Sequence, residues 1–139
     1  MQKAPPMTDD EIVIISDSLE QCSDLLGDIV PHVYRRFFKL DPTAAALMEY
    51  SDEHMRGRMF ASVLELFVSN DPFESDGFLA WELENHVNAY AVTPAMYGSL
   101  FNAFIGVVRE ALQDDWSTEV ERAWMNRVQR VMTEVSRRG

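Results

Sequence analysis

A single histidine stands at a position where it could take part in binding chemistry. His86 lies near the end of an amphipathic segment, residues 78–90, with Leu79 and Leu83 on the preceding turns and a corner leading to Val92 after it. A neutral imidazole can bind a metal ion through either ring nitrogen. On residue type alone, such a histidine is more often an ordinary hydrogen-bonded or solvent-facing helix residue. A binding role for His86 therefore depends on its neighbours in the sequence.

Most catalytic and metal-binding signatures are absent from the sequence. One cysteine, Cys22, and three scattered histidines, His32, His54 and His86, form no zinc-ligand pattern and no histidine pair four residues apart. There is no G-x-S-x-G nucleophile motif and no glycine-rich phosphate loop. The sequence therefore offers no set of catalytic residues that stands on its own.

Composition and charge narrow the class of protein. The 139 residues fit one domain, and a hydrophobic content of 47% is enough to form a core. Acidic residues outnumber basic ones 23 to 12, so we expect neither nucleic acid nor an anionic membrane as a partner. One cysteine, no membrane-length apolar run and a polar N-terminus predict a cytoplasmic protein.

Helical periodicity and capping residues recur along the chain, and no segment reads as a strand. We expect helices over residues 8–26 and 29–40, a short one through 44–48 that opens with a cap at Asp41, and the amphipathic segment 78–90. Longer helices are expected after caps at Ser51 or Asp52, at Thr93 and at Ser117 or Thr118. Val33, Phe37 and Leu40 are expected to face inward from the second helix. Residues 1–7 are predicted to be a flexible leader and residues 8–137 one all-α domain.

Three stretches of the chain, in this order, resemble the globin family, in particular the bacterial single-domain haemoglobins. Residues 33–42 are similar to the family's FY-x-R-x-F-x-x-x-P stretch, and residues 86–97 to its H-x-x-x-G-V-x-P-x-x-Y segment. Residues 123–124 resemble the tryptophan pair of the last globin helix. The resemblance implies a globin-like fold of six to eight helices in a single domain.

The resemblance also implies a haem b group held between two helices, with His86 as the protein ligand of the iron. Tyr34 would then lie on the distal side, where its hydroxyl could donate a hydrogen bond to a bound gas. Met55 takes the place of the usual distal histidine or glutamine, Met59 lies one turn further, and Arg58 is either a partner of a haem propionate or an ordinary solvated residue. The other residues implied to line the haem are Met48, Leu79, Leu83, Val92, Tyr97 and Phe101.

Several departures from the family pattern favour a second interpretation. Met48 stands where globins show a phenylalanine, Met55 is not polar, and Val128 replaces a tyrosine that supports the proximal histidine. His86 is also one residue further from Pro94 than usual, and one residue turns a helical side chain by about 100°. The alternative is a haem-free globin-fold sensor or interaction module, whose pocket is filled by methionine side chains or holds an apolar ligand.

The first interpretation is a haem-binding globin that reversibly binds oxygen or nitric oxide for transport, sensing or detoxification. Catalysis stays open: a nitric-oxide dioxygenase-like activity would need a separate reductase as electron donor. We expect the protein to be a monomer or a homodimer.

Overall fold

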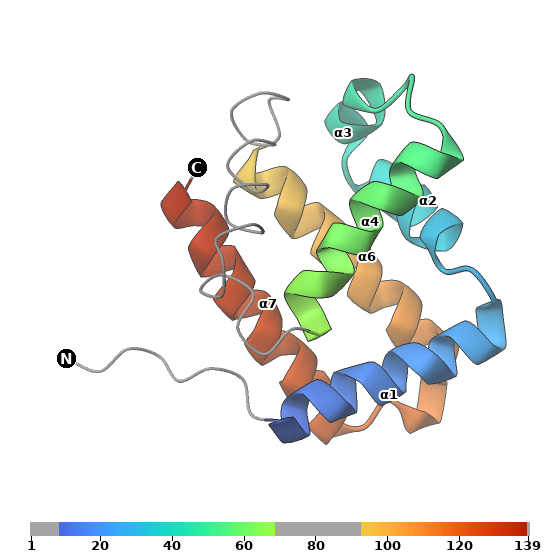
Figure 1. Ribbon diagram of the computed structural model, residues 1–139, viewed down its shortest axis with the longest axis vertical. Helices are drawn as coiled ribbons and strands as arrows, with labels where there is room; N and C mark the ends of the chain where they lie inside the picture. The colour runs from blue at the N-terminus through green and yellow to red at the C-terminus, as the bar shows by residue number, and fades with distance from the viewer. Residues whose placement is uncertain (1–8, 69–92, 139) are drawn as a thin grey trace.

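The structure is a computed structural model that describes residues 9–68 and 93–138. Within these ranges the chain is helical and contains no strand (Figure 1). The elements are α1 (Asp9–Leu26), α2 (Val30–Leu40), α3 (Pro42–Leu47), α4 (Glu53–Val68), α6 (Pro94–Leu112), the short 3-10 turn η1 (Gln113–Asp115) and α7 (Thr118–Arg138). The all-α class predicted from helical periodicity is confirmed.

Side-chain caps begin several of these helices, as the sequence predicts. Asp41, Asp52, Thr93 and Ser117 each accept a hydrogen bond from the backbone N–H three residues further on, at 3.1, 2.8, 3.2 and 3.2 Å. Such a bond satisfies one of the N–H groups that the first helical turn leaves without an intrahelical partner. Of the two candidates before α4, the cap is therefore Asp52 and not Ser51.

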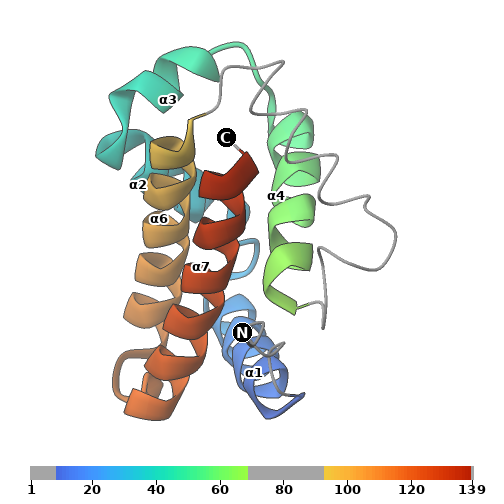
Figure 2. The same ribbon diagram turned by 90° about the vertical axis from the view of Figure 1, so that its left-hand side faces the viewer.

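The helices pack around α6 and α7 (Figure 2). These two helices run side by side in opposite directions and are joined through η1. The first helix, α1, packs against both of them, and α2 packs against α6. The fourth, α4, contacts α1, α2 and α7. None of the helices in the described ranges is both long and apolar enough to span a membrane.

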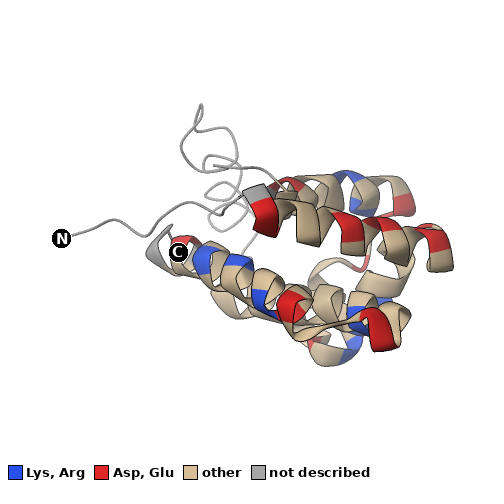
Figure 3. Ribbon diagram, turned by 90° about the horizontal axis from the view of Figure 1, so that it is seen from below, with Lys and Arg blue, Asp and Glu red and all other residues tan. Residues whose placement is uncertain are grey.

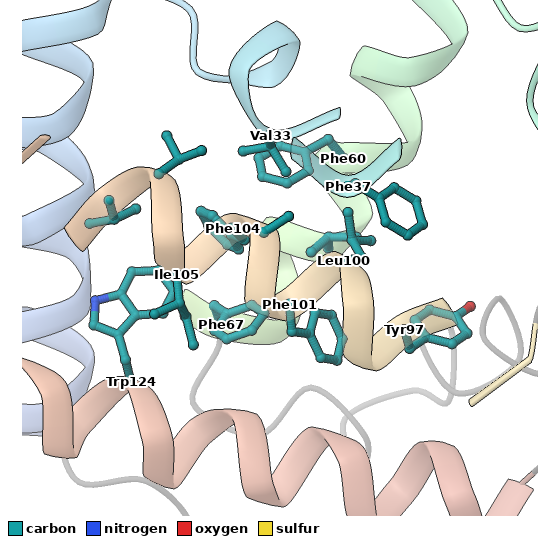
Figure 4. Close-up of a cluster of buried hydrophobic side chains, with 14 of the residues drawn as sticks. Val33, Phe37, Phe60, Phe67, Tyr97, Leu100, Phe101, Phe104, Ile105 and Trp124 are labelled. Carbon is teal, nitrogen blue, oxygen red and sulfur yellow. The ribbon is translucent and has the colours of Figure 1, made fainter. Parts of the chain in front are cut away.

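Aromatic rings from α4, α6 and α7 fill the centre of this bundle (Figure 4). The Phe104 ring meets Phe60 edge-on at 4.9 Å between ring centres, Phe67 at 5.3 Å and Trp124 at 5.0 Å. Phe67 also meets Phe101 at 5.3 Å, and all five side chains are fully buried. Burial of each such ring stabilises the fold by about 1.5–3 kcal/mol, so this cluster fixes how the three helices are placed.

Charge is distributed unevenly over the helices (Figure 3). The first helix, α1, carries six acidic side chains and no basic one, Asp9, Asp10, Glu11, Asp17, Glu20 and Asp24. The last helix, α7, mixes arginines with glutamates. The six carboxylates of α1 thus make a large contribution to the net charge of -11.

One inward-facing prediction for α2 is wrong. Val33 and Phe37 are 0% and 4% exposed as expected, whereas Leu40 is 54% exposed. Leu40 is the last residue of α2, and the chain turns at Asp41 into α3. Helical periodicity treats every turn as equally covered, and it therefore overestimates burial where a helix ends.

Candidate functional site

Tyr34 lies on the buried face of α2 among aromatic rings. Its ring centre lies 5.7 Å from that of Phe38, 6.1 Å from Phe37 and 6.3 Å from Phe60, the last in an edge-on arrangement. The side chain is only 3% exposed, and burial raises the pKa of its hydroxyl to about 12. The phenol therefore stays protonated at neutral pH and keeps its proton for donation.

The Tyr34 hydroxyl makes no hydrogen bond within the described part of the chain. The Tyr34 ring is contacted by three phenylalanine rings and by the Arg56 guanidinium. The distal role predicted for this hydroxyl stays a prediction.

Arg56, near the start of α4, contacts the same aromatic group. Its guanidinium carbon lies 4.9 Å from the centre of the Phe38 ring and 5.9 Å from that of Tyr34, within the range of cation–π attraction. The Nε group donates a hydrogen bond of 2.9 Å to the Ser51 hydroxyl, and Nη2 donates one of 3.5 Å to the Met48 carbonyl. Arg56 thus connects α4 to α2 and to the turn that follows α3.

Arg56 was not among the site residues predicted from the sequence, although its spacing from the apolar residues of α4 pointed to it. The buried residues of α4 are Phe60, Val63 and Phe67, at 0%, 7% and 0% exposure, and Arg56 precedes Phe60 by one helical turn. Four- and three-residue steps extended backwards from these side chains lead to Arg56. The resemblance to globins assigned the distal position to the neighbouring Met55 instead.

The two methionines and the arginine predicted on α4 lie at different depths. Met55 is 42% exposed, Arg58 is exposed, and Met59 is half-buried. One residue along a helix rotates a side chain by about 100°, and the buried face passes through Phe60 rather than through Met55. The roles predicted for these three residues toward haem stay predictions.

Met48 lies in the turn that Arg56 contacts. It follows the last residue of α3, and its side chain is half-buried against the hydrophobic core. Its carbonyl accepts a hydrogen bond of 2.7 Å from the Ser51 hydroxyl in addition to the one from Arg56. These bonds hold the Met48 backbone close to the start of α4.

Tyr97 and Phe101 lie one turn apart on α6, after the Thr93 cap. They are 8% and 0% exposed, and their ring centres are 6.0 Å apart. Figure 4 shows both side chains on the α6 segment that passes beside Phe67. Both are therefore part of the hydrophobic core, and their predicted contact with haem stays a prediction.

The other predicted site residues, Leu79, Leu83, His86 and Val92, lie outside the described residues. The assignment of His86 as the iron ligand therefore remains a prediction. Among the described side chains, no group of three or more His, Cys, Asp or Glu is placed to hold a metal ion.

The order and packing of these helices match a known family. The model of the Globin family matches residues 31–135, which is more than half of the chain. The chain belongs to the globin family. The matched range of this globin contains Tyr34, Arg56, Tyr97 and Phe101, and the whole of α1 precedes it.

This globin also resembles a solved structure. A protein from Pseudomonas aeruginosa PAO1, described as structurally highly homologous to a human hemoglobin, matches with a TM-score of 0.78 and 21% sequence identity. The match covers 92% of this chain and 97% of that chain. At this identity the likeness establishes the fold, so the predicted single-domain globin fold is confirmed. No curated protein matches the chain.

Proposed function

We propose that this globin binds haem b and, on the haem, reversibly binds a diatomic gas, either oxygen or nitric oxide. The observation that carries the proposal is the buried Tyr34 side chain, protonated at neutral pH and without a hydrogen-bond partner in the described part of the chain. A hydroxyl donor within a cluster of aromatic rings suits a small polar ligand. Membership of the globin family supports haem as the group that holds this ligand.

The chain carries residues whose chemistry suits such a group, some of them outside the described ranges. Haem iron would supply the coordination position for the gas. The imidazole of His86 would bind the iron, and the exposed guanidinium of Arg58 suits a propionate carboxylate at the solvent edge. The apolar contacts would come from Met48, Met59, Leu79, Leu83, Val92, Tyr97 and Phe101, with Met55 at the outer margin.

The Tyr34 hydroxyl would stabilise a gas ligand that carries partial negative charge, and it would do so without losing its proton. Such a site serves transport, storage, sensing or detoxification. Turnover of nitric oxide would require a separate reductase. We further propose a cytoplasmic protein that acts as a monomer or a homodimer.

The test is the visible absorption spectrum of the protein produced with ample haem, first oxidised, then reduced with dithionite, then exposed to carbon monoxide. We expect a sharp Soret band that shifts when carbon monoxide is added. If no band develops even after hemin is added to the apo-protein, the proposal fails. The alternative, a haem-free globin module with an apolar or methionine-filled pocket, would then stand.

A further inference from the structure

Arg56 is held in one place by contacts on two sides. On one side its guanidinium lies over Phe38 at 4.9 Å and near Tyr34 at 5.9 Å. On the other side Ser51 and the Met48 carbonyl accept its hydrogen bonds, at 2.9 and 3.5 Å. A half-buried arginine with four such contacts is not an ordinary solvated helix residue.

The charge of Arg56 acts on the phenol of Tyr34. Burial raises the pKa of the Tyr34 hydroxyl, and the nearby Arg56 charge opposes that rise. A cation that favours the phenolate also polarises the O–H bond and makes it a stronger hydrogen-bond donor. Arg56 also packs on Phe38, and Phe38 packs on Tyr34, so the position of Arg56 limits the movement of the phenol ring.

We propose that Arg56 is a positioning and specificity-determining residue: by stacking over Phe38 and Tyr34 it fixes the distal phenol and favours polar or anionic gas ligands over apolar ones of the same size. This inference rests on the proposed function, since it concerns the ligand that Tyr34 meets. Oxygen, which carries partial negative charge when bound, gains from the arrangement, whereas carbon monoxide gains little.

The experiment compares Arg56→Met with Arg56→Lys, and uses Arg35→Met as the matched control. Arg35 is an exposed arginine on α2 next to Tyr34 in the sequence, so its replacement makes the same change in charge without touching the cluster. In the haem-loaded protein, we expect Arg56→Met to speed oxygen dissociation by roughly three- to tenfold. The dissociation of carbon monoxide should change by less than about twofold, because that ligand accepts hydrogen bonds weakly. Arg56→Lys should restore part of the oxygen effect.

A second measurement uses the haem-free protein. The ultraviolet absorbance of tyrosinate is followed against pH, and the titration of Tyr34 is identified by its loss in Tyr34→Phe. We expect the pKa of Tyr34 to rise in Arg56→Met and to stay unchanged in Arg35→Met. Ser51→Ala keeps the charge of Arg56 and removes its 2.9 Å anchor, together with the bond from Ser51 to the Met48 carbonyl. It serves as a milder variant if Arg56→Met does not fold.

An unchanged Tyr34 titration in Arg56→Met would overturn the proposal. So would a shifted titration with an unchanged ratio of carbon monoxide to oxygen affinity, because Arg56 would then act on the phenol without selecting the ligand. Failure of the proposed function is seen separately, as a wild-type protein that takes up no haem. That result would remove the ligand selection, while the titration would still decide whether Arg56 acts on Tyr34.

Discussion

The Trp124 indole nitrogen donates a hydrogen bond of 2.9 Å to the Ser18 hydroxyl, which joins α7 to α1 across the core. Ser18 in turn donates to the Ile15 carbonyl at 2.7 Å, so both polar groups are satisfied although both side chains are buried. This pair fixes the rotation of α1 against α7.

Loss of the Ser18 hydroxyl should therefore destabilise the fold. In Ser18→Ala the Trp124 indole N–H stays buried without its acceptor, and we expect the free energy of unfolding to fall by about 1–3 kcal/mol. Urea unfolding followed by circular dichroism measures the change. Ser136→Ala, an exposed site on α7, is the control and should stay within about 0.5 kcal/mol of wild type.

Replacement of Tyr34 by phenylalanine tests the distal donor. If the hydroxyl donates to a bound gas, Tyr34→Phe should speed oxygen dissociation by roughly tenfold, the equivalent of one hydrogen bond of about 1.4 kcal/mol. Stopped-flow displacement of oxygen by carbon monoxide gives the rate. Tyr50→Phe, at a residue 92% exposed, should match wild type. An unchanged rate in Tyr34→Phe would reduce Tyr34 to a packing residue.

The raised pKa of Tyr34 predicts a loss of stability in alkali. Its folded-state pKa is about 12 against an ordinary value near 10, so between these values the unfolded chain gives up the proton first. Stability from this group is fully present below about pH 10 and is lost as the pH rises through about 12, a total of about 2–3 kcal/mol.

Urea midpoints at about pH 9 and about pH 11 check this prediction, with Tyr34→Phe as the reference. Between the lower and the higher pH, wild type should lose more unfolding free energy than Tyr34→Phe, because only wild type has the buried hydroxyl. A gap that stays constant between the two pH values would contradict the burial argument.

His86→Ala tests the predicted iron ligand. Without the imidazole we expect the protein to lose haem while its helical circular dichroism is largely retained, because one exchanged side chain leaves the aromatic core of α4, α6 and α7 in place. Absorbance after gel filtration reports the retained haem. His32→Ala should keep haem. A His86→Ala protein that holds haem as well as wild type would remove His86 from this role.

Gly106 allows a cross-helix ion pair that a Cβ would obstruct. The Arg36 side chain from α2 crosses Gly106 to pair with Glu110, and this contact lowers the pKa of that carboxyl. In an Arg36→Met background, Gly106→Ala should stabilise α6 by up to about 1 kcal/mol through helix propensity. In the wild-type background, displacement of Arg36 should offset part of this gain. Urea unfolding of all four proteins measures the coupling, and strictly additive effects would refute it.

The sequence by itself determined the fold class and several helix starts. Asp41 and Thr93 cap their helices through hydrogen bonds to residues three positions away, so the chain carries this information locally. Helical periodicity also placed Val33 and Phe37 on the buried face of α2, where the structure has them. Local geometry suffices for such features because both partners lie in one short segment.

Only the tertiary structure decided which side of α4 faces inward. Met55 and Arg56 are neighbours, and a rotation of one residue exchanges the one that meets the core. The rings of Phe38 and Tyr34 on α2 select Arg56, because a cation gains from two aromatic faces there. The sequence pattern of α4 fits a face through Met55 as well as one through Arg56, and contacts with segments far apart in the chain choose between the two.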